Sequence, residues 1–401
     1  MKGWDKITLG EICLKYGGKV QTGPFGSQLH EYDYKDVGIP VIMPKDISGN
    51  TVNIDNIAKI SIEKANSLSK HKVKEGDIVF PRRGEITKRA YIRKNQIGFI
   101  CGTGCLKISI DSSHVASEYL NYFLSKSDTI EWLIGNSVGA TMKNLSGEII
   151  KKLPINLPPL STQRKIASIL STYDDLIENN HKRIKLMEEL AQRTYEEWFV
   201  KFRVKGEELK VKKETRLPED WSEVLVGNLI QFQKGRKVNQ TFNEPKPGFE
   251  KVLLLDGIES GNYPYTDPLN HVIAEEGDLL MLMDGARSSK VFFADRGVVG
   301  STMARIVINH DHITPSLLKN FFDFNFEQMK VNNTGAAIPH ANKAFINGML
   351  LPQPPDIVLK AWDETIIPIY VLMRKITNQT RLLKEARDIL LPRLMSGEIE
   401  V

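Results

Sequence analysis

The feature that most constrains this chain is a long heptad pattern near its middle. Between residues 161 and 202, apolar side chains recur at alternating steps of four and three, on a segment rich in Glu, Lys, Arg and Gln. The main positions of this seam are Ile166, Leu170, Tyr173, Ile177, Asn180, Ile184 and Met187. So narrow a stripe predicts one long helix that pairs with another helix. At ~1.5 Å per residue, the helix would be a rod of roughly 60 Å.

The last part of the chain carries the same pattern and is the expected partner. Adding 199 to the seam positions gives Ile369, Leu372, Ile376, Gln379, Leu383 and Ala386. Asn180 falls on Gln379, so we expect a polar layer that fixes the register of the pair. Pro368 is expected to kink the second helix or to delay its start. The alternative is two ordinary amphipathic helices, each packed on its own domain.

Glycine-marked motifs recur in the same order in the two halves of the chain. The matches are Trp4 with Trp221, Gly18-Lys19 with Gly235-Arg236, Gly76-Asp77 with Gly277-Asp278, Arg83-Gly84 with Asp284-Gly285, Gly139-Ala140-Thr141 with Gly335-Ala336-Ala337, and Leu153-Pro154 with Leu351-Pro352. Order is kept while the spacing drifts, which indicates a duplicated unit with shortened loops in the second copy.

Each copy reads as a mixture of short strands and helices, so the fold class is α+β. Single helices are expected at residues 117–135 and 316–330. We predict globular domains at residues 1–157 and 217–353, and long helices at residues 158–203 and 354–401. An exposed, charged linker is expected at residues 204–216.

The sequence lacks the motifs that an enzyme acting on nucleic acid would need. It has no phosphate-binding loop and no complete dinucleotide fingerprint. Asn156–Leu160 only imitates an adenine methyltransferase motif, because Leu157 precedes the two prolines and no aromatic residue follows them. His310-Asp311-His312 is expected to be a plain loop, and three cysteines do not suggest a disulfide framework. We therefore expect a non-catalytic chain without a metal ion or cofactor of its own.

Composition restricts the partners of the chain. The formal charge is +5 at pH 7 and the pI about 8.8, values compatible with nucleic acid. No apolar run approaches eighteen residues, so no membrane association is expected and the chain is taken to be cytoplasmic.

Basic and amide side chains gather in the glycine-marked loops of each copy, although a soluble surface alone explains any one of them. The candidate DNA contacts are Gln28, Arg82, Arg83, Lys88, Arg89 and Lys143 in the first copy, and Arg236, Lys237, Asn239, Arg287, Lys290, His340, Asn342 and Lys343 in the second. Arg and Lys neutralise phosphates. In the major groove, Arg also forms bidentate hydrogen bonds with guanine, and Asn or Gln forms them with adenine. One scaffold with different loop chemistry is what two readers of different DNA sequences would need.

These features together resemble the specificity subunit of type I restriction–modification systems. The resemblance is carried by the glycine loop at residues 76–84, the loop 139–147, Leu153–Leu160 running into Gln163–Ile166, and the C-terminal Leu390–Glu398. It implies two target recognition domains that each read half of a split, asymmetric site in double-stranded DNA. It also implies that the long helices pair antiparallel, with pseudo-twofold symmetry, and space the half-sites.

The resemblance further implies partners that carry the chemistry. Two modification subunits would bind S-adenosylmethionine and methylate adenine, and restriction subunits would cut DNA with ATP and Mg²⁺. Three alternatives stay open: a similar subunit serving a methyltransferase without a nuclease, a self-sufficient methyltransferase, and a helical scaffold that binds only protein.

Overall fold

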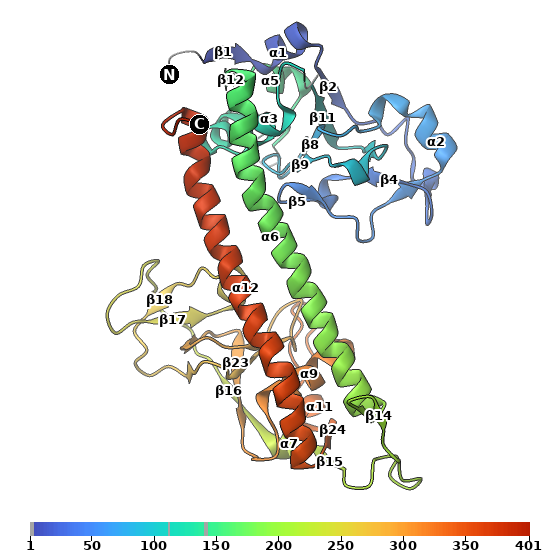
Figure 1. Ribbon diagram of the computed structural model, residues 1–401, viewed down its shortest axis with the longest axis vertical. Helices are drawn as coiled ribbons and strands as arrows, with labels where there is room; N and C mark the ends of the chain where they lie inside the picture. The colour runs from blue at the N-terminus through green and yellow to red at the C-terminus, as the bar shows by residue number, and fades with distance from the viewer. Residues whose placement is uncertain (1–3, 111–112, 140–142) are drawn as a thin grey trace. The chain divides into compact units, whose positions relative to one another are not determined.

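The computed structural model describes residues 4–110, 113–139 and 143–401, which form two compact units (Figure 1). The first unit comprises residues 1–175 and 384–401, and the second comprises residues 176–383. Two long helices, α6 (Leu160–Tyr195) and α12 (Asp356–Ser396), contribute to both units.

The first unit is an α+β globule with two four-stranded sheets, ordered β2-β11-β8-β9 and β10-β4-β7-β3. Its strands are β1 (Asp5–Thr8), β2 (Lys19–Thr22), β3 (Tyr34–Lys35), β4 (Ile39–Ile42), β5 (Ile47–Ser48), β6 (Thr51–Val52), β7 (Lys59–Ile60), β8 (Ile78–Pro81), β9 (Ala90–Tyr91), β10 (Ile100–Cys101), β11 (Cys105–Ser109) and β12 (Pro154–Leu157). Its short helices are α1 (Leu9–Tyr16), α2 (Ile62–Ser67), α3 (Ser117–Phe123), α4 (Ser127–Asn136) and α5 (Gly147–Lys151). Phe80, Tyr119 and Ile150 lie in its main core, between the first sheet and these helices.

The second unit repeats this plan, with sheets ordered β16-β23-β20-β21 and β18-β17-β22-β19. Its strands are β13 (Arg203–Val204), β14 (Glu207–Glu208), β15 (Ser222–Leu225), β16 (Ile230–Lys234), β17 (Glu250–Leu253), β18 (Tyr265–Thr266), β19 (Ile273–Ala274), β20 (Leu279–Leu282), β21 (Val291–Phe293), β22 (Gly297–Val299), β23 (Met303–Ile308) and β24 (Leu350–Gln353). Its short helices are α7 (Val226–Leu229), α8 (Leu255–Ser260), α9 (Pro315–Phe324), α10 (Phe326–Val331) and α11 (Lys343–Asn347).

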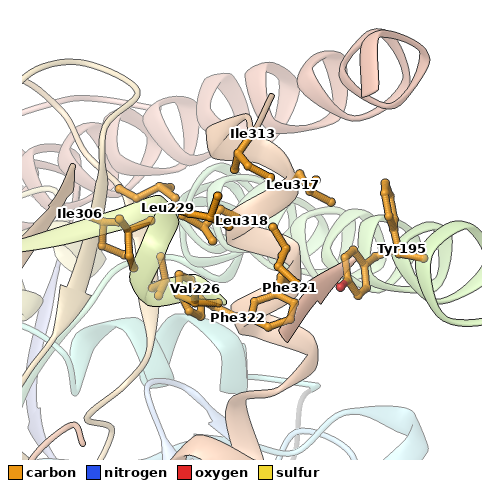
Figure 2. Close-up of a cluster of buried hydrophobic side chains, with 14 of the residues drawn as sticks. Tyr195, Val226, Leu229, Ile306, Ile313, Leu317, Leu318, Phe321 and Phe322 are labelled. Carbon is orange, nitrogen blue, oxygen red and sulfur yellow. The ribbon is translucent and has the colours of Figure 1, made fainter. Parts of the chain in front are cut away.

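Helix α9 contributes a large part of the apolar core of the second unit. It starts where the Oγ1 atom of Thr314 accepts a hydrogen bond from the backbone N–H of Leu317, with Pro315 in the first turn. Figure 2 shows Leu318 and Phe322 beside Val226 and Leu229, inside a buried cluster. Packing of this apolar face, rather than helix propensity, holds so short a helix in place.

The single helices expected at residues 117–135 and 316–330 are each broken in two, so this expectation is wrong. The hydroxyl of Ser125 donates to the carbonyl of Tyr122 (2.6 Å), and the side-chain amide of Asn325 donates to the carbonyl of Phe321 (2.8 Å). Such local bonds compete with continued helix formation, which explains why both breaks fall at a short polar residue.

The long helices α6 and α12 pair antiparallel within each unit. In the first unit, Ile166 near the start of α6 shares a core with Leu394 near the end of α12. In the second unit, Trp198 beyond the end of α6 packs on Trp362 near the start of α12, with ring centroids 5.8 Å apart. The predicted class, two α+β globules alternating with two long helices that pair antiparallel, is confirmed.

Pro368 does not delay the second helix, so the expectation of a later start is wrong. Figure 1 draws α12 (red) as a continuous helix that begins at Asp356, well before the proline. Pro368 lies on the exposed side of α12, as does Glu364, whose carbonyl loses its usual intrahelical partner. Water can reach that carbonyl, which reduces the cost of the proline.

The seam of α12 departs from the heptad read in the sequence. Ile376 is buried as expected, but Leu372 is 40% exposed, and Thr380 is buried where the sequence favoured Gln379. A straight helix drifts by about 20° per heptad against a strict 3.5-residue repeat. Positions counted in strict heptads from one end of a long helix therefore move off its buried face after a few turns.

The repeat is real, but one of the sequence matches is misplaced. The backbone N–H of Gly23 donates to the carbonyl of Cys105 (2.9 Å), and that of Gly235 donates to the carbonyl of Met303 (2.9 Å). Gly235 is therefore equivalent to Gly23, not to Gly18 as the sequence suggested. The equivalence was hidden because the helix before the strand is shorter in the second copy: α7 has 4 residues and α1 has 8. Ala140 and Thr141, in the match with Gly335–Ala337, lie outside the described residues.

Candidate nucleic-acid interface

Loops from separate parts of the first unit meet at one edge of its main sheet. Thr22 at the end of β2 pairs with Leu106, and Pro81 at the end of β8 pairs with Cys105 at the start of β11. The loops 23–28, 82–89 and 102–104 therefore emerge side by side. The segment 143–144 joins them, because Arg83 forms a β-bridge with Asn144. We call this set of loops the first edge, and it contains Gln28, Arg82, Arg83, Lys88 and Lys143.

The candidate residues of the first edge differ in their surroundings. Arg83 is exposed and Arg82 is half-buried. Lys88 pairs with Glu85 at 2.5 Å, which reduces its availability to a phosphate. Gln28 shapes its own loop, because its Oε1 atom accepts a hydrogen bond from the backbone N–H of Phe25 at 3.3 Å.

Arg89 belongs to the interior of the first unit rather than to its edge. Its Nε–H donates to both the backbone carbonyl and the Oδ1 atom of Asn121 on α3, at 3.1 Å each. Burial lowers the pKa of this guanidinium to about 10, although Asp174 opposes the shift. Neighbouring side chains such as Lys88 and Arg89 point in different directions, which residue type alone does not show.

The second unit has an equivalent edge. Lys234 at the end of β16 pairs with Ala304, and Leu282 at the end of β20 pairs with Met303 at the start of β23. The loops 235–249, 283–290 and 300–302 meet there, with the segment 334–343 joined through a bridge between Asp284 and His340. This second edge contains Arg236, Lys237, Asn239, Arg287, Lys290, His340, Asn342 and Lys343.

Several candidates of the second edge are already engaged within the protein. Both Nη atoms of Arg287 donate to the carboxylate of Glu259, at 2.6 and 2.8 Å, and these bonds raise the pKa of Arg287. Asn342 caps α11, accepting from the backbone N–H of Phe345 at 3.1 Å. Lys237 and Asn239, by contrast, are exposed on the loop after β16. The fixed residues shape the edge, while the exposed ones can meet a ligand.

Asp284 was not among the site residues predicted from the sequence, and Lys234 was predicted only as part of the basic loop that follows it. The carboxylate of Asp284 lies 2.7 Å from Nδ1 of His340 and 3.1 Å from Nζ of Lys234. Burial raises the pKa of Asp284, but hydrogen bonds from His340 and Lys234 outweigh it and hold the pKa below its ordinary value. The match of Arg83 with Asp284 was the available signal, and a search for basic residues passed over it.

Metal-binding and membrane-spanning features are missing from the described part of the chain. Residues 4–110, 113–139 and 143–401 contain no group of three or more His, Cys, Asp and Glu side chains that could hold a metal ion. Within the same ranges, no helix has the length and apolarity needed to cross a bilayer.

Comparisons with known proteins match these features. A family model described as the type I restriction modification DNA specificity domain matches residues 1–189. The MjaIX specificity subunit of Methanocaldococcus jannaschii is 26% identical, over 100% of this chain and 94% of its own length. The putative MjaX specificity subunit of the same organism is 23% identical, over 91% and 88%. The fold is similar to the crystal structure of the S subunit from M. genitalium, with a TM-score of 0.60 and 14% identity over 98% and 96% of the two chains.

Two α+β units with equivalent clusters of polar loops, together with two long helices, thus make up a fold that this chain shares with an S subunit. Residues 1–189 match the type I restriction modification DNA specificity domain, and the whole chain is similar to type I specificity subunits, the family that its sequence resembles.

Proposed function

We propose that the two units are target recognition domains, each reading one half of a split site in double-stranded DNA through its edge. The observation that carries this proposal is the convergence of equivalent loops at equivalent sheet edges, with different side chains in each. Residues 1–157 and 217–353 would hold the two reading surfaces. Exposed cations such as Arg83 and Lys237 would supply phosphate or base contacts.

The test is co-expression of the full chain with candidate modification subunits, followed by sequencing for N6-methyladenine. A split methylated motif that appears only with this chain is the expected result. Exchanging residues 217–353 for those of a relative should then change one half of the motif and leave the other unchanged. Salt-dependent DNA binding without methylation would keep DNA recognition but remove the assignment to these partners. Absence of both would favour a protein-binding scaffold.

We infer that the paired helices dock the modification subunits. Large apolar side chains stay exposed on α6 and α12 within the second unit, and uncovered apolar groups of this kind favour a protein partner. They are Leu176, Leu186, Leu190, Ile357, Ile367, Val371, Leu372 and Leu382. Replacing Leu186 and Leu190 with Lys should abolish co-purification with a modification subunit while DNA selection persists. Replacing the exposed charged Lys185 with Glu is the control.

The same helices are proposed to set the distance between the half-sites. Removing one heptad from α6 and one from α12 shortens each helix by about 10 Å, because each residue rises 1.5 Å. At ~3.4 Å per base pair this corresponds to roughly three base pairs of unread spacer. A methylome map with an unchanged spacer would contradict the ruler. The number of modification subunits, two by family resemblance, is measurable by mass determination of the assembled complex.

A further inference from the structure

The second edge holds a charged cluster at the point where its loops are joined. Oδ1 of Asp284 meets Nδ1 of His340 at 2.7 Å, and Oδ2 meets Nζ of Lys234 at 3.1 Å. The side chain of Asp284 is 23% exposed, whereas His340 and Lys234 are about half exposed. The carboxylate is therefore less exposed than the two nitrogen-bearing side chains that contact it, and a part of it still reaches the surface.

The backbone around Asp284 is fixed on both sides. The N–H of Gly285 donates to the carbonyl of Pro339 (2.9 Å), and the N–H of Ala341 donates to the carbonyl of Met283 (2.8 Å). His340 itself exchanges two backbone hydrogen bonds with Thr334, at 2.7 and 2.9 Å. A side chain held in this way is preorganised, as a recognition group should be.

The first unit carries different side chains at the same three positions. Gly84 donates to the carbonyl of Lys143 (3.2 Å) as Gly285 does to that of Pro339, which makes Arg83 equivalent to Asp284 and Asn144 to His340. The strand registers make Thr22 equivalent to Lys234. Equivalent positions at the two edges thus present a guanidinium donor in one unit and a carboxylate acceptor in the other.

The free hydrogen-bonding capacity of the cluster suits one kind of base atom. An ionised carboxylate only accepts, and it offers about four lone-pair directions, of which His340 and Lys234 use two. In the major groove, hydrogen-bond donors are the exocyclic amino groups of cytosine N4 and adenine N6. In a complex with DNA, the cation of Lys234 would offset the repulsion between this carboxylate and the phosphates.

We propose that Asp284, supported by His340 and Lys234, accepts a hydrogen bond from an exocyclic amino group of cytosine or adenine at one position of the DNA site. This inference rests on the proposed function, because it assumes that the second edge reads DNA. It assigns to Asp284 a specificity role that a search for basic residues overlooks, and it makes Arg83 the guanine-directed counterpart in the other half-site.

The experiment selects binding sites from randomised DNA duplexes with the full chain and its modification subunit. The variants are Asp284→Ala and Asp323→Ala, the latter removing a carboxylate that pairs with Lys319 on α9, outside the edge. Asp284→Ala should reduce the preference for cytosine or adenine at one position of one half-site by on the order of ten- to a hundred-fold. Asp323→Ala should leave the selected sequence unchanged, although it alters net charge equally. Whether the lost base is cytosine or adenine identifies the amino group.

The possible failures are separable. If the unaltered protein selects no motif, the proposed function fails. If it selects a motif that Asp284→Ala shares, only the role of Asp284 fails. A loss of folding by Asp284→Ala, seen in a thermal melt, transfers the test to Asp284→Leu, which is similar in size and removes both acceptor oxygens, and an unchanged base preference there overturns the proposal. As a gain-of-function test, Lys234→Thr, Asp284→Arg and His340→Asn together should shift that position toward guanine.

Discussion

The side-chain amide of Asn180 donates a hydrogen bond to Oε1 of Gln379 at 3.5 Å, and these two residues occupy equivalent positions in α6 and α12, 199 residues apart. In an antiparallel pair, equivalent positions run in opposite directions, so equivalent residues meet at only one level. Asn180 is buried in that layer (4% exposed), whereas Gln379 is exposed. The two long helices of the duplicated unit therefore contact each other through polar side chains at equivalent positions.

Replacing Asn180 and Gln379 together with Leu should raise the free energy of unfolding by about 1 kcal/mol, because a buried amide gives way to apolar packing. Urea unfolding followed by circular dichroism measures the change. Leu at the neighbouring exposed Asn378 serves as the control and should change little. A clear loss of stability in the double variant would show that the polar layer contributes more than register.

Asp174 ties α3 and α12 together in the first unit. Its carboxylate accepts from Nη1 of Arg387 and from the hydroxyl of Tyr122, both at 2.6 Å, and it is 14% exposed. Asp174→Ala should lower the free energy of unfolding by about 3 kcal/mol, because Arg387 loses a partly buried partner. Asp388, the other partner of Arg387, is 63% exposed, and Asp388→Ala should cost less than about 0.5 kcal/mol. Equal effects in a denaturant titration would contradict the assignment.

Gly23 lies where two backbone segments pass closely. A Cβ atom at this position would lie 1.9 Å from the carbonyl oxygen of Gly102, so Gly23→Ala should destabilise the protein by about 3 kcal/mol. Gly26, in the same loop, has open space where a Cβ atom would lie. Gly26→Ala should be neutral or stabilising by up to about 1 kcal/mol. Thermal melts of the two variants decide the matter, and similar melting temperatures would contradict the close approach.

Glu118 gives the first unit a pH dependence with a defined sign. Burial, reinforced by Asp175, raises the pKa of Glu118 above its ordinary value of 4.5, although Arg93 opposes the shift. A carboxyl with a raised pKa binds its proton more tightly in the folded state, so its destabilising charge develops as pH rises through that folded pKa. Glu118→Gln should therefore raise the melting temperature at pH 7.5 and have little effect at pH 4. The exposed Glu131→Gln is the control, and a stabilisation of equal size at both pH values would rule out the charge as the cause.

The ion pair of Arg287 with Glu259 keeps one cation of the second edge occupied. Glu259→Ala should increase affinity for DNA of random sequence and steepen the dependence of log K on log salt by about 1, because Arg287 becomes available to a phosphate. Binding isotherms at several salt concentrations measure the slope. Asp267→Ala, which also removes an exposed carboxylate from the second unit, controls for net charge. Weaker binding by Glu259→Ala would indicate that the pair, rather than free Arg287, contacts DNA.

The sequence by itself determined the architecture of this protein. Heptad spacing predicts helix pairing because side-chain direction along a helix is periodic, so the apolar residues fall on one face. The offset of 199 between the two heptad patterns already matched Asn180 with Gln379. The glycine-marked loops exposed the duplication because positive-φ turns such as those at Gly76 and Gly277 tolerate few other residues. The family resemblance then rested on the order of these local signals.

Only the tertiary structure decided which polar side chains face outward and which are engaged within the protein. Arg89 and Arg287 belong to a residue type that suits DNA contact, yet one binds Asn121 of α3 and the other binds Glu259 of α8. Asp284 was overlooked because its position at the second edge depends on a bridge to His340, 56 residues away. Hydrogen-bond partners are set by contacts between distant segments, and residue type and spacing carry no information about such contacts until the sheets are assembled.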